Sequence, residues 1–184
     1  MKKVFIVHGF EGSPNGGWRP WLMAELEKQD VYACALAMPK PEKPVCAEWV
    51  EEISRAVGKN PRDDIYLVGH SLGVPAILRF LEQTEAKNIR GSVLVSGLIE
   101  EIKLGLLKQF FTNPFDFQSI KTKCPQFTVI HGTNDHIVLS RQAEILSQKL
   151  NARLIWVENG GHLNGSAGWH ILSQCLEALT KMMK

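Results

Sequence analysis

Short apolar segments recur at regular intervals along the chain of 184 residues. Most of them are apolar at every position rather than at alternate positions, which is the pattern of parallel strands covered by helices on both faces. The segments are VFIV (4–7), VYACAL (31–36), IYLV (65–68), SVLVS (92–96), FTVI (127–130) and RLIWV (153–157). They predict a sheet of buried, parallel strands.

Between these segments, apolar residues repeat every three or four positions, which is helical spacing. The five stripes are Trp18, Leu22 and Leu26; Trp49, Ile53, Ala56 and Val57; Leu72, Ala76, Phe80 and Leu81; Ala143, Leu146 and Leu150; and Leu172, Leu176, Leu179 and Met183. Strands and helices therefore alternate along the chain. This alternation predicts an α/β fold, with an open sheet that carries helices on both faces.

The length of the chain is that of one domain, 1–184, because chains divide into several domains only when they are considerably longer. One interval, 97–126, is long and contains no clear strand. It begins near EEIKLGLLKQFF, for which we predict a helix, and continues with TNPFDF, for which we predict a turn. A connection of this length is expected to be a lid-like insertion.

Composition narrows the classes of function. Apolar residues make up 45% of the chain, and Lys plus Arg exceed Asp plus Glu by only 21 − 19 = 2. So small a net charge, with the basic residues scattered, argues against a nucleic acid or an anionic membrane as partner. The first residues, MKKVFIVHGF, hold too few apolar positions for a secretory signal, and no run has transmembrane length. We therefore expect a cytoplasmic protein.

The four cysteines are widely spaced and form no Cys-x-x-Cys pair; they are Cys34, Cys46, Cys124 and Cys175. Each lies in or beside an apolar segment, where a reduced cysteine behaves as a small buried hydrophobic residue. No cluster of candidate metal ligands occurs along the sequence. We expect no disulfide, no metal site and no other cofactor.

One turn carries the clearest chemical signal. In YLVGHSLGVPAIL (66–78), Gly69, Ser71 and Gly73 form a Gly-x-Ser-x-Gly pattern between a predicted strand and a predicted helix. This pattern is typical of a nucleophile elbow, a sharp turn that exposes the serine hydroxyl at the carboxyl edge of the sheet. The glycines remove the Cβ atoms that would clash with the strand and the helix. The pattern predicts that Ser71 is a nucleophile, once a base takes its proton.

An elbow in such a sheet predicts an acid after a later strand and a histidine after the last strand. Asp135 follows the fifth apolar segment, and His162 lies in a glycine-rich loop after the sixth. We predict that His162 takes the proton from Ser71 and that Asp135 orients and stabilises the imidazole. Glu158 is the alternative acid, but it comes directly after its strand and shortly before the histidine.

Two backbone donors are needed for the oxyanion that forms when the serine attacks. The N–H of Leu72, the residue after the nucleophile, is the first candidate. The second is the N–H of Phe10, in the loop HGFEGSPNGGW that follows the first strand, whose glycines allow a close approach to the substrate. An ordinary flexible loop is the alternative interpretation of this segment.

Residues beside these groups are candidates for contact with a substrate. They are His8, Gly9, Trp18 and His70. The side chain of His70 is expected to diverge from that of its neighbour Ser71. Apolar walls of the pocket could come from Trp18, Phe110, Phe111 and Phe115, and ordinary packing is an equally good interpretation of these aromatic residues. The remaining histidines, His131, His136 and His170, are expected to have structural or surface roles.

With these residues placed, the chain resembles the α/β-hydrolase superfamily, and within it the small single-domain serine hydrolases related to retinoblastoma-binding protein nine. The likeness extends over the chain and rests on GWRPWL (17–22), GHSLG (69–73), GTNDHIV (132–138) and GGHLN (160–164). The resemblance implies a minimal α/β-hydrolase fold, a three-layer α/β/α sandwich with a six-stranded parallel sheet. It also implies a triad of Ser71, Asp135 and His162.

The function that we expect is hydrolysis of a small-molecule ester, thioester or amide through an acyl-enzyme, as in a carboxylesterase or thioesterase. One alternative is a protein-interaction module on the same scaffold with incidental activity, which leaves a protein partner open. Another is an acyltransferase or a peroxide-using enzyme, in which the same triad serves a different acceptor. An intact triad favours an enzyme, because a binding module has no need of a strained elbow.

Overall fold

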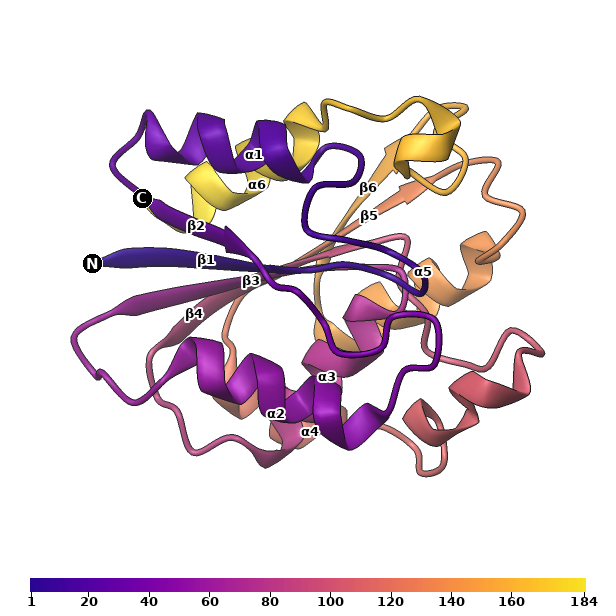
Figure 1. Ribbon diagram of the computed structural model, residues 1–184, viewed down its shortest axis with the longest axis horizontal. Helices are drawn as coiled ribbons and strands as arrows, with labels where there is room; N and C mark the ends of the chain where they lie inside the picture. The colour runs from indigo at the N-terminus through magenta and orange to yellow at the C-terminus, as the bar shows by residue number, and fades with distance from the viewer.

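All 184 residues are described by a computed structural model, which contains one sheet of six strands in the order β2-β1-β3-β4-β5-β6 (Figure 1). Every neighbouring pair of strands is parallel. The strands are β1 (Lys2–Val7), β2 (Tyr32–Ala35), β3 (Asp64–His70), β4 (Ile89–Val95), β5 (Phe127–Gly132) and β6 (Arg153–Val157). The six apolar segments therefore predicted every strand, and the α/β fold class is confirmed.

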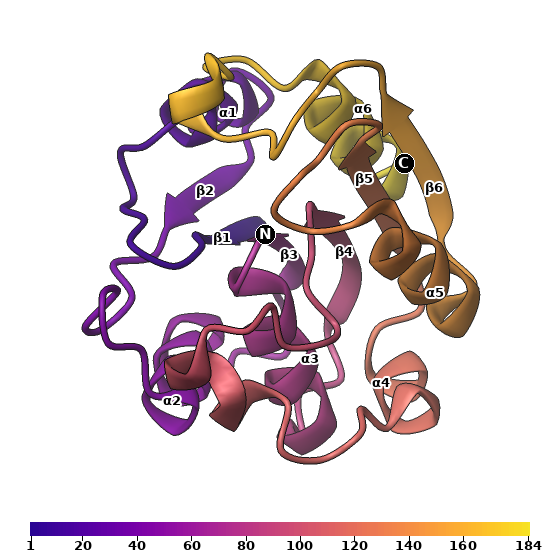
Figure 2. The same cartoon turned by 90° about the vertical axis from the view of Figure 1, so that its right-hand side faces the viewer.

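Helices cover both faces of the sheet (Figures 1 and 2). One face carries α1 (Arg19–Glu27) and α6 (Ser173–Met182), and the other carries α2 (Cys46–Val57), α3 (Gly73–Gln83), α4 (Phe117–Lys123) and α5 (Ser140–Leu150). The predicted stripes face the sheet: Trp49 and Ile53 of α2, for example, are fully buried. In α6 the buried stripe also includes Cys175, whereas Leu176 is only partly buried.

The connection 97–126 differs from the prediction. Its helix is a short 3₁₀ segment, η1 (Gly105–Phe110), and it also contains α4, which the apolar pattern did not indicate. Asp116 begins α4 by accepting hydrogen bonds from the backbone N–H groups of Gln118 and Ser119, which is a typical N-cap. Side-chain hydrogen bonds attach the connection to α2 and α3, among them that from the Cys46 N–H to Gln109. The structure therefore places it beside these helices rather than as a lid over Ser71.

Because all strands are parallel, their carboxyl ends share one edge of the sheet, which faces the viewer in Figure 2. The loops that follow β1, β3, β5 and β6 gather there, including the short 3₁₀ segment η2 (Gly165–Ala167) after β6. Ligands bind at this edge in open α/β sheets. No helix of the protein combines the length and the apolar character needed to cross a membrane.

Candidate active site

The turn between β3 and α3 holds Ser71 in a left-handed backbone conformation, with φ of 53°. Such a conformation is costly for a residue with a side chain, and it persists only where the surroundings impose it. A Cβ on Gly69 would lie 3.0 Å from the backbone of Gly73, and a Cβ on Gly73 would collide with the carbonyl oxygen of Val7. Both glycines are therefore required for the helix to pack this closely on β1 and β3.

Asp135, after β5, contacts His162, after β6. The Oδ2 atom of Asp135 lies 2.8 Å from Nδ1 of His162, and both side chains are buried. The other carboxylate oxygen accepts the backbone N–H groups of Ile137 and Val138, at 2.9 and 3.0 Å. Burial alone would raise the pKa of Asp135, but the hydrogen bond from His162, its charge and the two backbone donors outweigh burial and lower it. The carboxylate therefore stays ionised beside the imidazole.

The loop after β5 also fixes the backbone around His162. Asn134 accepts the N–H of Gly161 at 2.7 Å, and Thr133 accepts the N–H of Asn159 at 3.1 Å. The residues on either side of His162 are both left-handed, Gly161 with φ of 54° and Leu163 with φ of 50°. Three consecutive side chains of one loop, 133–135, thus position the histidine and its loop.

Two ring nitrogens hold the same loop from the opposite side. His70 Nε2 lies 3.0 Å from the carbonyl oxygen of His162, and Trp18 Nε1 donates to the next carbonyl, that of Leu163, at 2.8 Å. A carbonyl only accepts, so the hydrogen of neutral His70 is on Nε2. The rings of Trp18 and His70 pack edge to face, with centroids 6.0 Å apart. The backbone of His162 is therefore constrained on both sides.

A cavity of about 260 Å³ brings Ser71 and His162 together. It is lined by the loop after β1, the elbow and the loop after β6. No hydrogen bond joins the two side chains in this structure; catalytic hydrogen bonds are often long without substrate and shorten in the complex. The cavity is smaller than most ligand sites, which span roughly 300–1,000 Å³. It suits a small substrate.

Of the two predicted oxyanion donors, one belongs to a residue that lines this cavity and the other to the residue after Ser71. Phe10 lines it, and Leu72 follows Ser71 at the start of α3. Neither backbone N–H donates a hydrogen bond within the protein. Free N–H groups at the beginning of a helix carry positive potential, which favours a developing negative charge. Both groups are therefore available to an oxyanion.

Comparison with known proteins agrees with this geometry. The sequence profile described as Serine hydrolase matches residues 4–181. The chain belongs to the serine hydrolase family. It is 36% identical over 181 residues to YdeN of Bacillus subtilis (strain 168), whose name proposes a hydrolase, with 97% of this chain and 95% of YdeN covered. The crystal structure of the ydeN gene product matches with a TM-score of 0.93 and 34% identity, over 100% of this chain and 99% of that one.

More distant relatives of this serine hydrolase point the same way. The serine hydrolase RBBP9 of Rattus norvegicus is 24% identical over 169 residues, which cover 89% of this chain and 88% of RBBP9. The esterase domain of a Rhodothermus marinus protein has a TM-score of 0.75 at 13% identity, over 98% of this chain and 86% of that domain. This second likeness shows the fold alone. The serine hydrolase profile and YdeN establish a hydrolase, and the structural neighbours agree with the α/β-hydrolase fold.

Two predicted substrate contacts of this hydrolase lie elsewhere. Neither His8 nor Trp18 lines the cavity with Ser71. Nδ1 of His8 lies 2.8 Å from the Gly9 carbonyl oxygen, and Nε2 accepts the N–H of Met38, so both ring nitrogens are used within the protein. Trp18 is fully buried and holds the loop after β6. The predicted contacts that do line the cavity are Gly9 and His70.

The structure places the alternative acid, the remaining histidines and the phenylalanines of the connection outside the pair of Asp135 and His162. Glu158 is exposed and makes no hydrogen bond or ion pair with His162, unlike Asp135. His136 and His170 are exposed, whereas His131 is buried and its Nε2 lies 2.8 Å from the carbonyl oxygen of Val138. The three phenylalanines predicted as pocket walls lie away from the cavity and pack against neighbouring rings: Phe110 against Trp49, and Phe111 against Phe115. Ordinary packing is therefore the interpretation that the structure supports for them.

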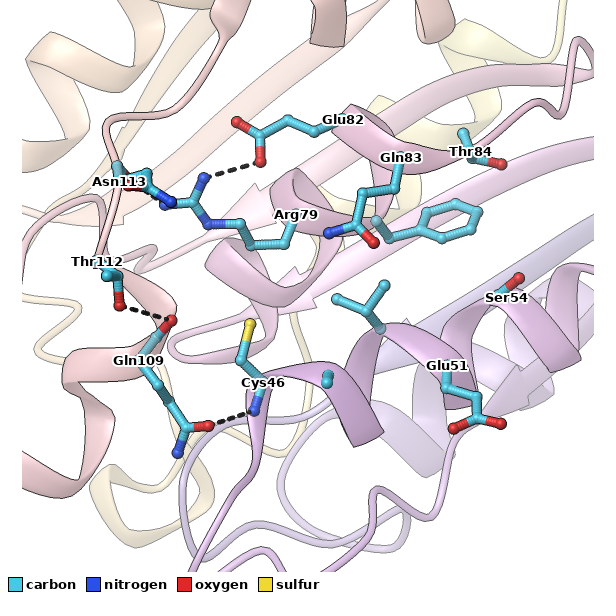
Figure 3. Close-up of a pocket in the computed structure, with 13 residues that line it drawn as sticks. Cys46, Glu51, Ser54, Arg79, Glu82, Gln83, Thr84, Gln109, Thr112 and Asn113 are labelled. Atoms are coloured by element: carbon cyan, nitrogen blue, oxygen red, sulfur yellow. Dashed lines mark hydrogen bonds and ion pairs between the residues drawn. The ribbon is translucent and has the colours of Figure 1, made fainter.

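A larger cavity, of about 680 Å³, lies between α2, α3 and the segment that contains η1 (Figure 3). It shares no lining residue with the cavity of Ser71. Each nitrogen of the Arg79 guanidinium beside it has an acceptor: the group pairs with Glu82 at 2.8 Å and donates to the carbonyl oxygens of Phe110 and Asn113. Of the two cavities, only the smaller one holds the elements of hydrolytic chemistry.

Sequence reasoning missed Arg19, which lines the cavity of Ser71 and is only 6% exposed. A signal for it was present. Arg19 stands three residues before Leu22 and seven before Leu26, so helical spacing places it on the buried stripe of α1. A charged residue on a buried stripe is unusual. Its position at the start of the helix, next to the carboxyl edge of the sheet, pointed to the active site.

Acid should destabilise this hydrolase through its buried histidines. Burial, with the charge of His162 acting in the same direction, lowers the pKa of His70 to about 3. The unfolded chain takes up this proton near pH 6.5 and the folded protein only near pH 3, so stability is lost as pH falls through that window. Between about pH 7.5 and about pH 5, His70 alone should lower the free energy of unfolding by about 2 kcal/mol.

The variant His70→Gln tests this, because glutamine keeps a donor toward the carbonyl of His162 but does not titrate. Urea unfolding at the two pH values should give a loss of stability that is about 2 kcal/mol smaller in the variant than in the wild type. His8 and His131 also have pKa values lowered by burial, and their contribution is common to both proteins. Equal losses in the two proteins would contradict the prediction.

Proposed function

We propose that this protein cleaves a small ester, thioester or amide through an acyl-enzyme on Ser71. The observation that carries the proposal is the buried pair of Asp135 and His162, 2.8 Å apart, at the cavity that also contains Ser71 on its strained turn. A serine, a histidine and an acid brought together from three separate loops are the groups that activated serine chemistry needs. Each structural constraint described above acts on one of these three residues.

In the proposed first step, Oγ of Ser71 attacks the carbonyl carbon while Nε2 of His162 takes the hydroxyl proton. Asp135 keeps the hydrogen of the imidazole on Nδ1 and stabilises the imidazolium. The N–H groups of Leu72 and Phe10 donate to the oxyanion. The intermediate then collapses: the bond to the leaving group breaks, and His162 gives its proton to the leaving atom.

In the second step, water takes the place of the leaving group. His162 removes a proton from the water as its oxygen attacks the acyl carbon, and the same N–H donors stabilise the second oxyanion. Collapse breaks the bond between Ser71 and the acyl carbon, releases the acid and returns the proton to the serine. Protein groups supply every proton transfer in this sequence.

A protein-interaction module remains the alternative, and the structure bears on the choice. A binding surface gains nothing from a left-handed serine or from a buried imidazole–carboxylate pair; both cost stability, and a reaction that needs them explains why they are kept. The small cavity favours a small acyl group. A cytoplasmic location and a protein partner stay predictions from the sequence.

The proposal is tested by rapid mixing with p-nitrophenyl acetate and with the matching thioester, S-phenyl thioacetate. We expect a burst of leaving group close to one per protein molecule, followed by slower turnover, and a quenched sample that carries one acetyl group on the peptide of Ser71. Added methanol as acceptor separates hydrolysis from acyl transfer. The acyl-enzyme would be contradicted if the protein releases the leaving group without a burst and if samples quenched during turnover carry no acetyl group on Ser71.

A further inference from the structure

A second charged group besides the imidazole–carboxylate pair lies at the cavity of Ser71. Arg19, the first residue of α1, lines this cavity, and its side chain is almost entirely buried, with 6% of the residue exposed. Gly16 makes room for it, because a Cβ at that position would lie 2.5 Å from Nη2 of the guanidinium. The proposed hydrolysis assigns no task to this arginine.

The guanidinium has few partners inside the protein. Its Nε donates to the carbonyl oxygen of Ser13 at 2.9 Å, and its Cζ lies 5.8 Å from the centre of the Trp18 ring. Neither terminal nitrogen donates a hydrogen bond, and no carboxylate pairs with it; Glu11, which also lines the cavity, is exposed and makes no ion pair.

Arg79 gives the comparison within the same chain. It is 9% exposed, and all three of its nitrogens have acceptors. Figure 3 shows the Glu82 carboxylate and Asn113, whose carbonyl oxygen accepts, and the third acceptor is the Phe110 carbonyl oxygen. That arrangement is the usual one, because a buried charge is otherwise costly. Arg19 is as deeply buried but keeps four of its five N–H groups free, since a guanidinium carries five.

The location of Arg19 adds to this cost. Burial lowers its pKa to about 10, so the side chain remains a cation at neutral pH. It also stands at the amino end of α1, where the helix dipole disfavours positive charge. Burial and the helix dipole therefore both oppose this charge, and within the protein only a carbonyl and an aromatic ring offset them. A buried, unpaired cation at an active site is explained if an anion completes it.

We propose that Arg19 binds a carboxylate of the substrate, so that this hydrolase acts on small acidic esters or thioesters. The proposal rests on the hydrolytic function proposed above. Because Arg19 and Ser71 line one cavity of about 260 Å³, the carboxylate must stand only a few atoms from the carbonyl under attack. A guanidinium can hold a carboxylate through two parallel hydrogen bonds, which gives orientation as well as charge pairing.

The carboxylate could belong to the acyl group or to the leaving group, and two pairs of substrates separate these cases. For the acyl side the pair is monoethyl succinate and its neutral amide, ethyl succinamate, with ethanol release measured. For the leaving-group side it is O-acetylglycolate and O-acetylglycolamide, with acetate release measured. Within each pair, one ester carries a carboxylate and the other a carboxamide. To correct for intrinsic reactivity, each enzymatic rate constant is divided by the rate constant for hydrolysis of the same ester by hydroxide.

In the wild type, we expect the acidic member of one pair to have a kcat/KM about tenfold to a hundredfold above that of its amide. This ratio corresponds to the free energy of a hydrogen bond between charged groups. The difference should lie mainly in KM. Arg19→Gln should remove that preference, and Arg19→Lys should restore part of it. Glu11→Gln is the matched charge change on the same cavity, and it should preserve or increase the preference for the acid.

Two outcomes would overturn the proposal while leaving the hydrolase intact. One is turnover of the neutral esters with no preference for the acid in either pair. The other is an equal loss on both members of a pair in Arg19→Gln, which is the result of a purely structural role. Circular dichroism and labelling of Ser71 by a fluorophosphonate show whether each variant is folded and competent. If the wild type turns over no ester and is not labelled, the proposed hydrolysis itself fails.

Discussion

Replacing Ser71 with alanine should reduce turnover of any substrate by a factor on the order of 10⁴ or more. The other serine that lines the cavity, Ser166, is exposed, and its hydroxyl donates to Asn164 rather than to His162. The fold should survive the change. Ser71 Oγ makes no hydrogen bond within the protein, and the tight approach of α3 to β1 depends on Gly69 and Gly73. Alanine also occupies no more space than serine. Initial rates with p-nitrophenyl acetate measure the effect.

Ser96 offers a matched control for this experiment. It follows β4, is fully buried, has a φ of 44°, and its hydroxyl also lacks a hydrogen-bond partner. It resembles Ser71 in backbone and burial but does not line the cavity. Ser96→Ala should therefore keep activity within a few-fold of the wild type. If Ser71→Ala stays as active as Ser96→Ala, Ser71 is not the nucleophile.

Replacing Asp135 with asparagine should lower kcat by a factor on the order of 10⁴ while leaving the protein folded. The amide can keep accepting the N–H groups of Ile137 and Val138 through its oxygen. Its NH₂ group then faces Nδ1 of His162 and forces the hydrogen onto Nε2. The nitrogen that should take the serine proton is thereby blocked.

Glu158→Gln is the control for the acid, since Glu158 is exposed and makes no hydrogen bond or ion pair with His162. It removes one negative charge from the same region of the chain and should change kcat less than a few-fold. Steady-state rates of the two variants at neutral pH decide the matter. A small effect of Asp135→Asn beside a large effect of Glu158→Gln would contradict the assignment.

The strands, and the residues at their carboxyl ends, were predictable because parallel strands leave a strong local signal. A strand covered on both faces must be apolar at nearly every position, and functional groups at its end are fixed by chain order. Asp135 and His162 are 27 residues apart in the sequence, yet the topology alone predicted that both belong to the edge of Ser71. Their contact in the structure follows from that rule.

The roles of the polar and aromatic residues around the site were less predictable, because they depend on tertiary contacts. Adjacency in sequence suggested that His8 and Trp18 contact a substrate, but their ring nitrogens bond to backbone groups. The start of α4 and the 3₁₀ form of η1 depend on capping and on packing against α3, which an apolar pattern does not record. Arg19 needed both its spacing and its missing partners to be noticed.

If Ser71 is an activated nucleophile, the purified protein should react with a fluorophosphonate, and intact mass measures the adduct. We expect one adduct per wild-type molecule, located on the peptide of Ser71, and none on Ser71→Ala, with Ser96→Ala labelled like the wild type. Folded wild-type protein that takes up no label, or label that persists in Ser71→Ala, would contradict the assignment of Ser71 as an activated nucleophile.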